Sequence, residues 1–461
     1  MSLRLEKNPD VNRSQLIGKK VAVLGAARSG LAVSQLLTSH GVSVLLSDVK
    51  PAAQLSLPMK IIQNKKITLE TGKHSGAILE SDLICISPGL PLDIPILKKA
   101  AQKHIPIIGE IEMASWFCPS PIFAITGSNG KTTTSTLIGK IFRKVEPRTI
   151  VAGNIGNPFS ESLLDNPTPE YVVLEISSFQ LETIFSFHPR LAVIMNLTAN
   201  HLDRYPDFES YARAKLNILM NMTDQDLLIY NWDDQYLKEQ VQNSKPQKLV
   251  FSQHSHTLPG IFWHDNQMII QLENKTEVIS LTNYRLRGPH NRYNMMVAAL
   301  ISYLQHISLE IIAQEISNFE GIEHRLEFVR ELHGIRFFND SKATTVDSLR
   351  YALQSFPGNI ILIAGGKDKG GDFWEVNDLL KERVKVAVLM GQASERMSEA
   401  WTKIIPVLRA KNLAEAVETA YHRAQSGDVV LLSPACSSFD MFRDYEDRGQ
   451  QFKKIVAGLN E

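Results

Sequence analysis

The 461-residue sequence has few cysteines, no net charge and no long apolar segment. Its three cysteines, Cys85, Cys118 and Cys436, lack the spacing of a metal site, and we expect them to stay reduced in a cytosol. Lys plus Arg and Asp plus Glu each number 49, which leaves no basic field to attract nucleic acid or anionic lipid. No apolar run reaches the length of a membrane span, and the first residues lack the apolar core of a signal peptide. We therefore expect a cytoplasmic protein without nucleic-acid or membrane partners.

One stretch is typical of a nucleoside-triphosphate site: Thr126-Gly127-Ser128-Asn129-Gly130-Lys131-Thr132-Thr133. An apolar run at 121–125 predicts a strand before it, and the pattern predicts a helix over 132–145. Backbone N–H groups of such a loop and the helix dipole face an anion, Lys131 reaches the β- and γ-phosphates, and Thr132 holds Mg²⁺. The usual first glycine is Ile125 here. A glycine turn beside a solvated lysine is the alternative, but strand, Gly-Lys-Thr and helix occur in the required order.

The N-terminal part predicts a nucleotide-binding α/β unit. Residues 19–30 read as a strand that enters a glycine turn and then a helix, and a second strand ends at Asp48. The second glycine of Gly-x-Gly-x-x-Gly is Ala27, which favours a mononucleotide or nucleotide-sugar over a dinucleotide. Asp48 stands where a ribose hydroxyl would be read, although capping of the next turn explains an aspartate there equally well.

Two predicted strands of the central part end in residues suited to a metal or a ligand. Glu175 lies in the apolar strand 171–176, where a carboxylate is costly unless it binds a cation or accepts hydrogen bonds, and this suits a Mg²⁺ ligand. A helix-capping contact is the alternative. His201 follows the strand 191–197, where ligand-facing residues gather, though a lone histidine is more often structural. Lys215 lies in a predicted helix and is by default a solvated residue.

The remaining pattern predicts an α/β protein of three domains. Short strands between 227 and 281 and an apolar helix over 295–305 complete the central part. Four strands, at 335–338, 359–364, 384–390 and 428–432, predict a third doubly wound unit with polar strand ends. We expect a Rossmann-like domain at 1–109, a P-loop ATPase-like domain at 110–321 and a second Rossmann-like domain at 322–461.

The phosphate-loop stretch, together with Glu175, His201, Asn291, Arg325 and Asp340, resembles the Mur ligase family of ATP-dependent amide ligases, which build the peptidoglycan stem peptide. Residues 174–182, 339–344 and 432–436 are similar to the members that add D-glutamate. The resemblance spans all three predicted domains. It implies ATP-dependent joining of D-glutamate to UDP-N-acetylmuramoyl-L-alanine through an acyl phosphate, with ATP and Mg²⁺ as cofactors, by a cytoplasmic monomer.

The resemblance also implies roles for individual residues. Catalysis would depend on Lys131, Glu175, His201 and Lys215, the last aligned with a lysine that is carbamylated in the family. ATP would be bound by Gly127, Ser128, Asn129, Gly130, Lys131, Thr132, Thr133, Asn294, Arg325 and Asp340. Metal ions would be held by Thr132, Glu175, His201 and Lys215. The uridine diphosphate would contact Ser29, Asp48, Val49, Lys50 and Gly89. The muramoyl group would contact Asn154, Ser177, Gln180 and His201. D-glutamate would contact Lys342, Thr344, Lys369, Ser438 and Phe439.

Two residues depart from the familiar pattern of the family. Tyr445 replaces a phenylalanine, which could change packing around the D-glutamate site, and Lys50 replaces an arginine, so that a forked contact becomes a point charge. Lys369, in a glycine-rich loop, would pair with a substrate carboxylate, although a solvated loop lysine is the alternative. Three other functions stay open: a different amino-acid ligase of the superfamily, a nucleotide-dependent switch, and a dinucleotide oxidoreductase.

Overall fold

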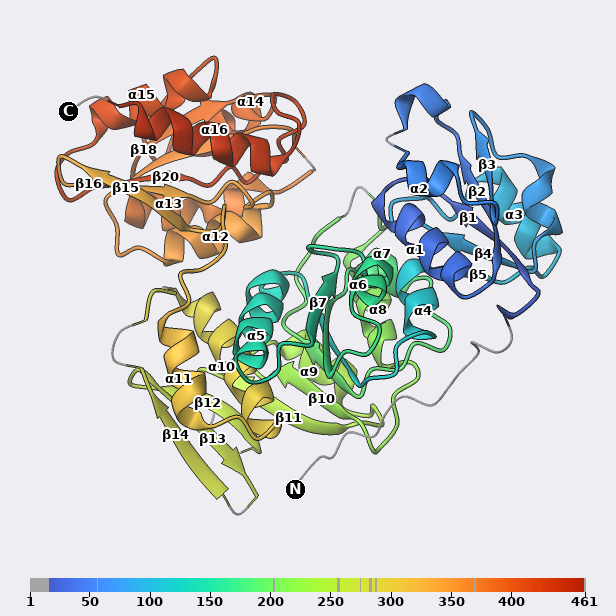
Figure 1. The fold of residues 1–461 in the computed structure, drawn as a ribbon. Helices are drawn as coiled ribbons and strands as arrows, with labels where there is room; N and C mark the ends of the chain where they lie inside the picture. Colours follow the sequence, from blue (N-terminus) through green and yellow to red (C-terminus); the bar gives the residue numbers. More distant parts are fainter. Residues whose placement is uncertain are drawn as a thin grey trace. The chain divides into compact units, whose positions relative to one another are not determined.

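The structure, a computed structural model, describes residues 16–55, 57–201, 204–254, 258–273, 275–281, 284–286, 288–368 and 370–459. Its contacts divide the chain into two compact units. The first comprises Met1–Leu197, Ala212–Ser280 and Met295–Glu315, and the second comprises Thr198–Tyr211, Leu281–Asn294 and Ile316–Glu461. Within the described ranges, no helix is both long and apolar enough to cross a membrane. Figure 1 shows the order of the elements along the chain.

The N-terminal sheet has five parallel strands in the order β3-β2-β1-β4-β5. The strands are β1 (Lys20–Leu24), β2 (Ser43–Asp48), β3 (Ile67–Thr71), β4 (Leu83–Ile86) and β5 (Ile107–Gly109), and the helices are α1 (Arg28–Ser39), α2 (Met59–Ile62), α3 (Pro95–Gln102) and α4 (Glu110–Ser115). The doubly wound unit is thus confirmed. Strand β3 was not predicted, because it is an edge strand with no fully buried residue and its pattern carries no run of apolar side chains.

The central sheet has nine strands in the order β14-β13-β12-β11-β10-β9-β6-β8-β7. They are β6 (Ile122–Thr126), β7 (Thr149–Gly153), β8 (Tyr171–Glu175), β9 (Leu191–Ile194), β10 (Leu227–Asn231), β11 (Gln247–Ser252), β12 (Gly260–His264), β13 (Gln267–Leu272) and β14 (Lys275–Ser280). The helices along this stretch are α5 (Lys131–Val145), α6 (Phe159–Asp165), α7 (Ser178–Leu181), α8 (Phe208–Leu216), α9 (Gln235–Val241), α10 (Pro289–Leu304) and α11 (Leu309–Ser317). Helix α10 begins six residues before the predicted start at 295, because Pro289 suits a first helical position.

The C-terminal sheet corrects the prediction of four strands, since six pair in the order β15-β16-β20-β17-β18-β19. They are β15 (Glu327–Leu332), β16 (Ile335–Asn339), β17 (Ile360–Gly365), β18 (Val384–Met390), β19 (Val407–Arg409) and β20 (Val429–Leu432). The two edge strands β15 and β19 were missed because neither is an apolar run; β15 pairs antiparallel and β19 has only three residues. The helices are α12 (Val346–Gln354), α13 (Asn377–Arg383), α14 (Ser394–Trp401), α15 (Leu413–Arg423) and α16 (Tyr445–Ala457).

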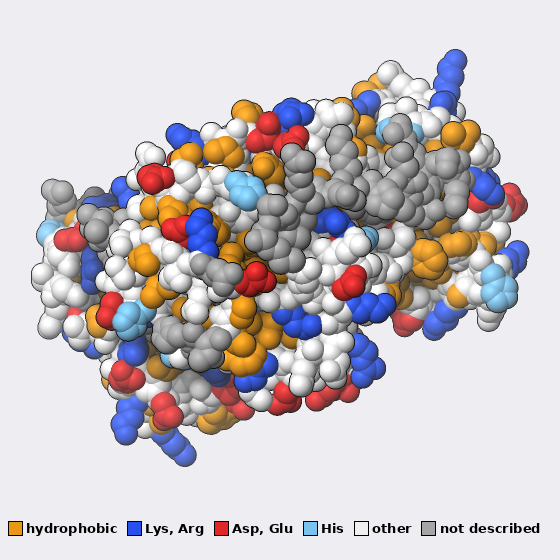
Figure 2. Space-filling model, turned by 90° about the horizontal axis from the view of Figure 1, so that it is seen from below, with side chains coloured by type: hydrophobic (Ala, Val, Ile, Leu, Met, Phe, Trp, Pro, Cys, Tyr) orange, Lys and Arg blue, Asp and Glu red, His pale blue; other side chains and the backbone are white. Residues whose placement is uncertain are grey.

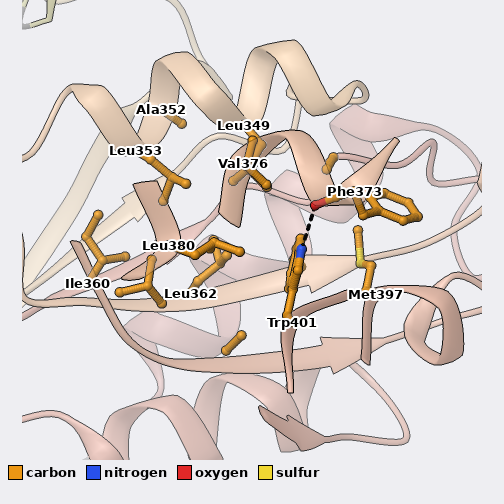
Figure 3. Packing of buried hydrophobic residues seen from close by; sticks show 14 of the residues in the cluster. Leu349, Ala352, Leu353, Ile360, Leu362, Phe373, Val376, Leu380, Met397 and Trp401 are labelled. Atoms are coloured by element: carbon orange, nitrogen blue, oxygen red, sulfur yellow. Dashed lines mark hydrogen bonds between the residues drawn. The ribbon is translucent and has the colours of Figure 1, made fainter. Parts of the chain in front are cut away.

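Helices cover both faces of this C-terminal sheet, with α12 and α13 on one side and α15 and α16 on the other (Figure 1). On the first side Trp401 is fully buried among Leu362, Leu380 and Met397, and its indole N–H donates to the carbonyl oxygen of Phe373 at 2.9 Å (Figure 3). Two buried layers therefore hold the sheet rigid, so that its strand ends can position polar groups. On the molecular face in Figure 2, basic and acidic side chains are interspersed.

Candidate active site

The phosphate loop joins β6 to α5 and depends on two glycines. Gly130 caps α5 with φ +84°, and Gly127 has φ +142°, where a Cβ atom would lie 2.8 Å from the Cβ of Met195. L-residues with side chains rarely adopt such angles, so both positions require glycine. The Lys131 ammonium folds back over the loop and donates to the carbonyl oxygens of Gly127 at 2.8 Å and Ser128 at 3.0 Å. The sequence prediction of a strand, loop and helix in this order is confirmed.

Asn196 fixes the backbone of this loop, and sequence reasoning gave it no role. Its side-chain oxygen accepts from Asn129 N at 2.8 Å, its amide donates to Asn129 O at 3.2 Å, and its carbonyl accepts from Ser128 N at 2.9 Å. Asn196 follows β9, which pairs directly with β6. Its position just after an apolar strand was the available signal, but the sequence does not reveal that β9 lies beside β6.

Glu175 ends β8, the other neighbour of β6, and its backbone pairs with Ile125. The carboxylate is 1% exposed. Its Oε1 accepts from Asn154 Nδ2 at 2.8 Å, whereas its buried Oε2 has no partner among the described residues. The capping alternative fails, since α7 is capped by Ser177 and Gln180, whose side chains each bond the other's backbone N–H. Glu175 is thus a buried carboxylate with an unused oxygen, which is costly without a cation.

The expectation that Lys215 is a solvated lysine was wrong, because the structure buries it. The side chain is 2% exposed, and burial lowers its pKa well below the usual range. The positive charge of Lys131 lowers this pKa further, while the carboxylate of Glu175 opposes the shift. The structure therefore brings Lys131, Glu175 and Lys215 into one electrostatic site and favours a neutral Lys215 amine. Its immediate neighbours on α8, Ala214 and Leu216, are apolar, but the pattern of the helix does not show which groups enclose the lysine.

The residues of this site fit a divalent cation. The unpartnered Glu175 oxygen and the Thr132 hydroxyl are hard oxygen donors, the type that Mg²⁺ takes, and both side chains are buried beside the phosphate loop. Mg²⁺ usually binds through one or two such protein ligands together with substrate phosphates.

A second group of polar residues surrounds Arg325 in the second unit. Asp340 accepts from Ser433 Oγ at 2.9 Å and from Leu326 N at 3.2 Å. Burial raises the pKa of Asp340 to about 7, opposed by Ser433 and by the Arg325 charge. Burial, with a smaller contribution from Arg325, lowers the pKa of His290 to about 4. Both Arg325 Nε and His290 Nδ1 are buried and lack a partner among the described residues, which suits an anionic or polar ligand.

The other residues predicted to bind ATP or the muramoyl group lie in different settings. Asn294 is 1% exposed and donates to Asn291 Oδ1 at 2.9 Å, so the two amides form a buried pair on α10. His201 belongs to the second unit, with φ +55° and its ring centroid 6.3 Å from that of Tyr211. Asn154 is exposed on the β7–α6 loop. His290, which sequence reasoning passed over, lies in the same helix as Asn294, and its only signal was its place in a polar stretch before an apolar helix.

The polar loops of the C-terminal sheet are tied together by Arg448, which was not predicted. This arginine is fully buried, and it donates to Ser341 Oγ at 2.9 Å, to Ser341 O at 2.7 Å and to Cys436 O at 3.2 Å. It thereby holds the loop after β16 against the loop after β20. Predicted D-glutamate residues lie on these loops: Lys342, Thr344, Ser438 and Phe439.

Contacts around the predicted D-glutamate residues differ in character. Ser438 is buried, whereas Phe439 is 68% exposed. The Lys342 ammonium lies 5.2 Å from the ring centroid of Tyr445, so the departure from phenylalanine keeps an aromatic face at this place. Lys369 lies outside the described residues. Glu323, His324 and Glu327 also cluster, but Lys453 Nζ already pairs with both glutamates, at 2.6 and 2.8 Å.

The N-terminal glycine turn holds the predicted uridine-diphosphate residues. Asp48 accepts from Lys50 N at 2.8 Å, as the capping alternative predicts, and also from Ala26 N at 2.7 Å. Gly25 has φ +96°, and a Cβ at Gly30 would lie 1.8 Å from the carbonyl oxygen of Gly25. The turn is therefore closed by a strand-end carboxylate and tolerates no side chain at Gly30. The predicted contact residues around it range from half-buried to exposed: Ser29, Val49, Lys50 and Gly89.

Known domains match most of the sequence. The Mur ligase MurD-like N-terminal domain matches residues 19–109, the Mur ligase middle domain matches 125–302, and the Mur ligase glutamate ligase domain matches 324–436. The chain is 41% identical over 449 residues to UDP-N-acetylmuramoylalanine–D-glutamate ligase of Geotalea uraniireducens, covering 97% of this chain and 99% of the relative. It is 42% identical over 447 residues to the ligase of that name from Koribacter versatilis, covering 96% and 98%.

Solved structures share the fold at low identity. MurF ligase from Thermotoga maritima in complex with ADP has a TM-score of 0.61 at 15% identity, covering 99% of both chains. Pseudomurein peptide ligase type C from Methanothermus fervidus has a TM-score of 0.61 at 17% identity, covering 96% of this chain and 100% of that one. Because all three parts match domains of one family and relatives above 40% identity extend over nearly the full length, the chain belongs to the Mur ligase family.

Proposed function

We propose that the protein joins D-glutamate to UDP-N-acetylmuramoyl-L-alanine at the expense of ATP, as a step of peptidoglycan synthesis. The main support is a relative named for this ligation, to which the chain is 41% identical over 97% of its length. The phosphate loop with its buried Glu175 and Lys215 supports the proposal, because an amide ligase must first activate a carboxylate, and a phosphoryl group from ATP does so.

The phosphate-loop residues would serve the first half of the reaction. The substrate carboxylate attacks the γ-phosphorus of ATP, which gives an acyl phosphate and ADP; the amine of D-glutamate then attacks the acyl carbon, and phosphate leaves. Lys131 neutralises charge that develops on the transferring group. Thr132 and Glu175 would hold Mg²⁺, which when bound offsets phosphate charge. Asn154 orients the Glu175 carboxylate through its 2.8 Å hydrogen bond.

Lys215 would supply a second anionic group. Only a neutral amine adds CO₂, and the lowered pKa of Lys215, caused by burial and the Lys131 charge, favours that form. Addition of CO₂, with release of a proton, would turn the neutral amine into a carbamate anion beside Lys131, and this anion would support a second Mg²⁺. In this proposal, carbamylation gives the Lys131 ammonium a neighbour of opposite charge.

Residues of the second unit would contact the nucleotide and D-glutamate. Arg325, Asp340 and Asn294 would hold the nucleotide, with the unpartnered Arg325 Nε available to a phosphate oxygen. Lys342, Thr344, Lys369, Ser438 and Phe439 would receive D-glutamate. The uridine diphosphate would occupy the N-terminal glycine turn, where Ala27 disfavours the dinucleotide of an oxidoreductase. Consumption of cytosolic ATP suits a cytoplasmic enzyme, and we expect a monomer.

The test is ADP release by the full chain with UDP-N-acetylmuramoyl-L-alanine and a panel of amino acids. We expect release with D-glutamate and at least a hundredfold less with L-glutamate or a diamino acid, since inverting the centre leaves a carboxylate without its partner. Equal use of another amino acid would point to a different ligase of the family. ADP release that is independent of any amino acid would favour a nucleotide-dependent switch.

A further inference from the structure

Arg28 extends from the N-terminal glycine turn to the loop between β7 and α6. Its Nη1 donates to Gly156 O at 2.8 Å, its Nε lies 3.3 Å from Glu161 Oε2, and its Nη2 donates to Asn157 Oδ1. All these residues belong to the first unit, and α1 packs directly on α6. One guanidinium thus engages three acceptors of one short segment, a geometry that the fork of arginine provides and a lysine cannot.

The segment that Arg28 holds is the one that orients Glu175. Asn154 donates to Glu175 twice, from its backbone N to Glu175 O at 2.8 Å and from its side chain to Glu175 Oε1 at 2.8 Å. Gly153 N donates to Asn157 O at 3.2 Å and closes the loop. At the start of α6, Ser160 donates from N and Oγ to the buried Glu110 at 2.7 and 2.6 Å. The loop is therefore held at both ends.

We propose that Arg28 is a positioning residue that sets the distance between the sugar-nucleotide turn and the phosphate-loop site, through the segment 153–161. Arg28 lies next to Ser29 in the turn expected to bind the diphosphate, and Asn154 lies at the other end of the connection beside Glu175. This inference rests on the proposed function, which requires one substrate to reach both places at once. Rigid spacing between two sub-sites lowers the entropy lost when such a substrate binds.

The test compares Arg28→Leu, Arg28→Lys and wild type in full-chain ADP release. We expect Arg28→Leu to raise KM for UDP-N-acetylmuramoyl-L-alanine about tenfold or more, with KM for ATP within about twofold, because the loop still binds nucleotide. Arg28→Lys should recover part of the loss, since one acceptor can still be reached. Arg148→Leu is the matched control, because it removes an arginine of similar exposure that pairs with Glu146 and Glu170.

A double-mutant cycle with Glu161→Gln separates positioning from direct contact with substrate. If Arg28 acts through the segment, Glu161→Gln alone raises the same KM, and Arg28→Leu has a smaller effect in that background. Strictly additive effects, or a KM that falls in Glu161→Gln, would overturn the proposal in favour of direct phosphate binding. An unchanged KM in a folded Arg28→Leu variant also overturns it. A wild type that releases no ADP when UDP-N-acetylmuramoyl-L-alanine, D-glutamate and ATP are all present would instead refute the proposed ligase function.

Discussion

Replacement of Lys131 by alanine tests the phosphate-loop site at its centre. The Lys131 ammonium makes two hydrogen bonds to loop carbonyls and exerts a like-charge effect on the buried Lys215. Hydrogen bonds from a charged donor contribute about 1.5–3 kcal/mol each, and the half-buried setting of Lys131 keeps these two near the lower value. We therefore expect the free energy of unfolding to fall by about 3 kcal/mol at most, with the fold retained. Loss of one positive group facing the transferring phosphoryl should cost about 3 kcal/mol, or a hundredfold or more in kcat.

The assay pairs ADP release with thermal unfolding of the same samples. A second effect is expected at Lys215, because removing the Lys131 charge lets the pKa of that amine rise and lowers the neutral fraction. Activity of Lys131→Ala should therefore respond more strongly to added bicarbonate than that of the wild type. Near-wild-type turnover by a folded Lys131→Ala variant would refute the phosphate-loop assignment.

Three further changes probe other parts of the chain. Asp226→Ala removes the carboxylate that lies 2.8 Å from the half-buried Arg190, and it should lower the free energy of unfolding, measured with urea, by about 3 kcal/mol. Burial alone would raise the pKa of Asp226, but hydrogen bonds from His188 and Thr223 lower it overall. The stabilisation by Asp226 should therefore be lost as the pH falls below about 4. Burial raises the pKa of Asp340 to about 7, so the folded state keeps a proton there that the unfolded state has already lost. The free energy of unfolding should therefore fall as the pH rises towards 7, and Asp340→Asn should make this fall less steep. An equally steep fall in the variant would contradict the raised pKa. Lys369→Ala should raise KM for D-glutamate far more than KM for ATP, and equal changes in both would count against a carboxylate contact.

Local sequence patterns predicted the features that depend on local backbone and burial. The prediction of a strand, loop and helix around Lys131 was correct, because the loop needs positive φ angles at two positions and glycine stands at both, Gly127 and Gly130. An apolar run likewise located strand β18 with the bounds that the structure gives. Edge strands such as β3 and β15 were missed. Few of their side chains are buried, so the sequence shows no apolar run at these places.

The supporting residues of the site could not be read from the sequence, because each depends on which strands lie side by side. Asn196 reaches the phosphate loop only because β9 pairs with β6. Lys215 is buried by packing against groups far away in sequence, and a helix pattern cannot show which polar residue is enclosed. Arg28 and Arg448 each join loops that follow different strands. The ends of predicted strands therefore indicate where functional residues lie, while the order of the strands in the sheet decides which other side chains hold them in place.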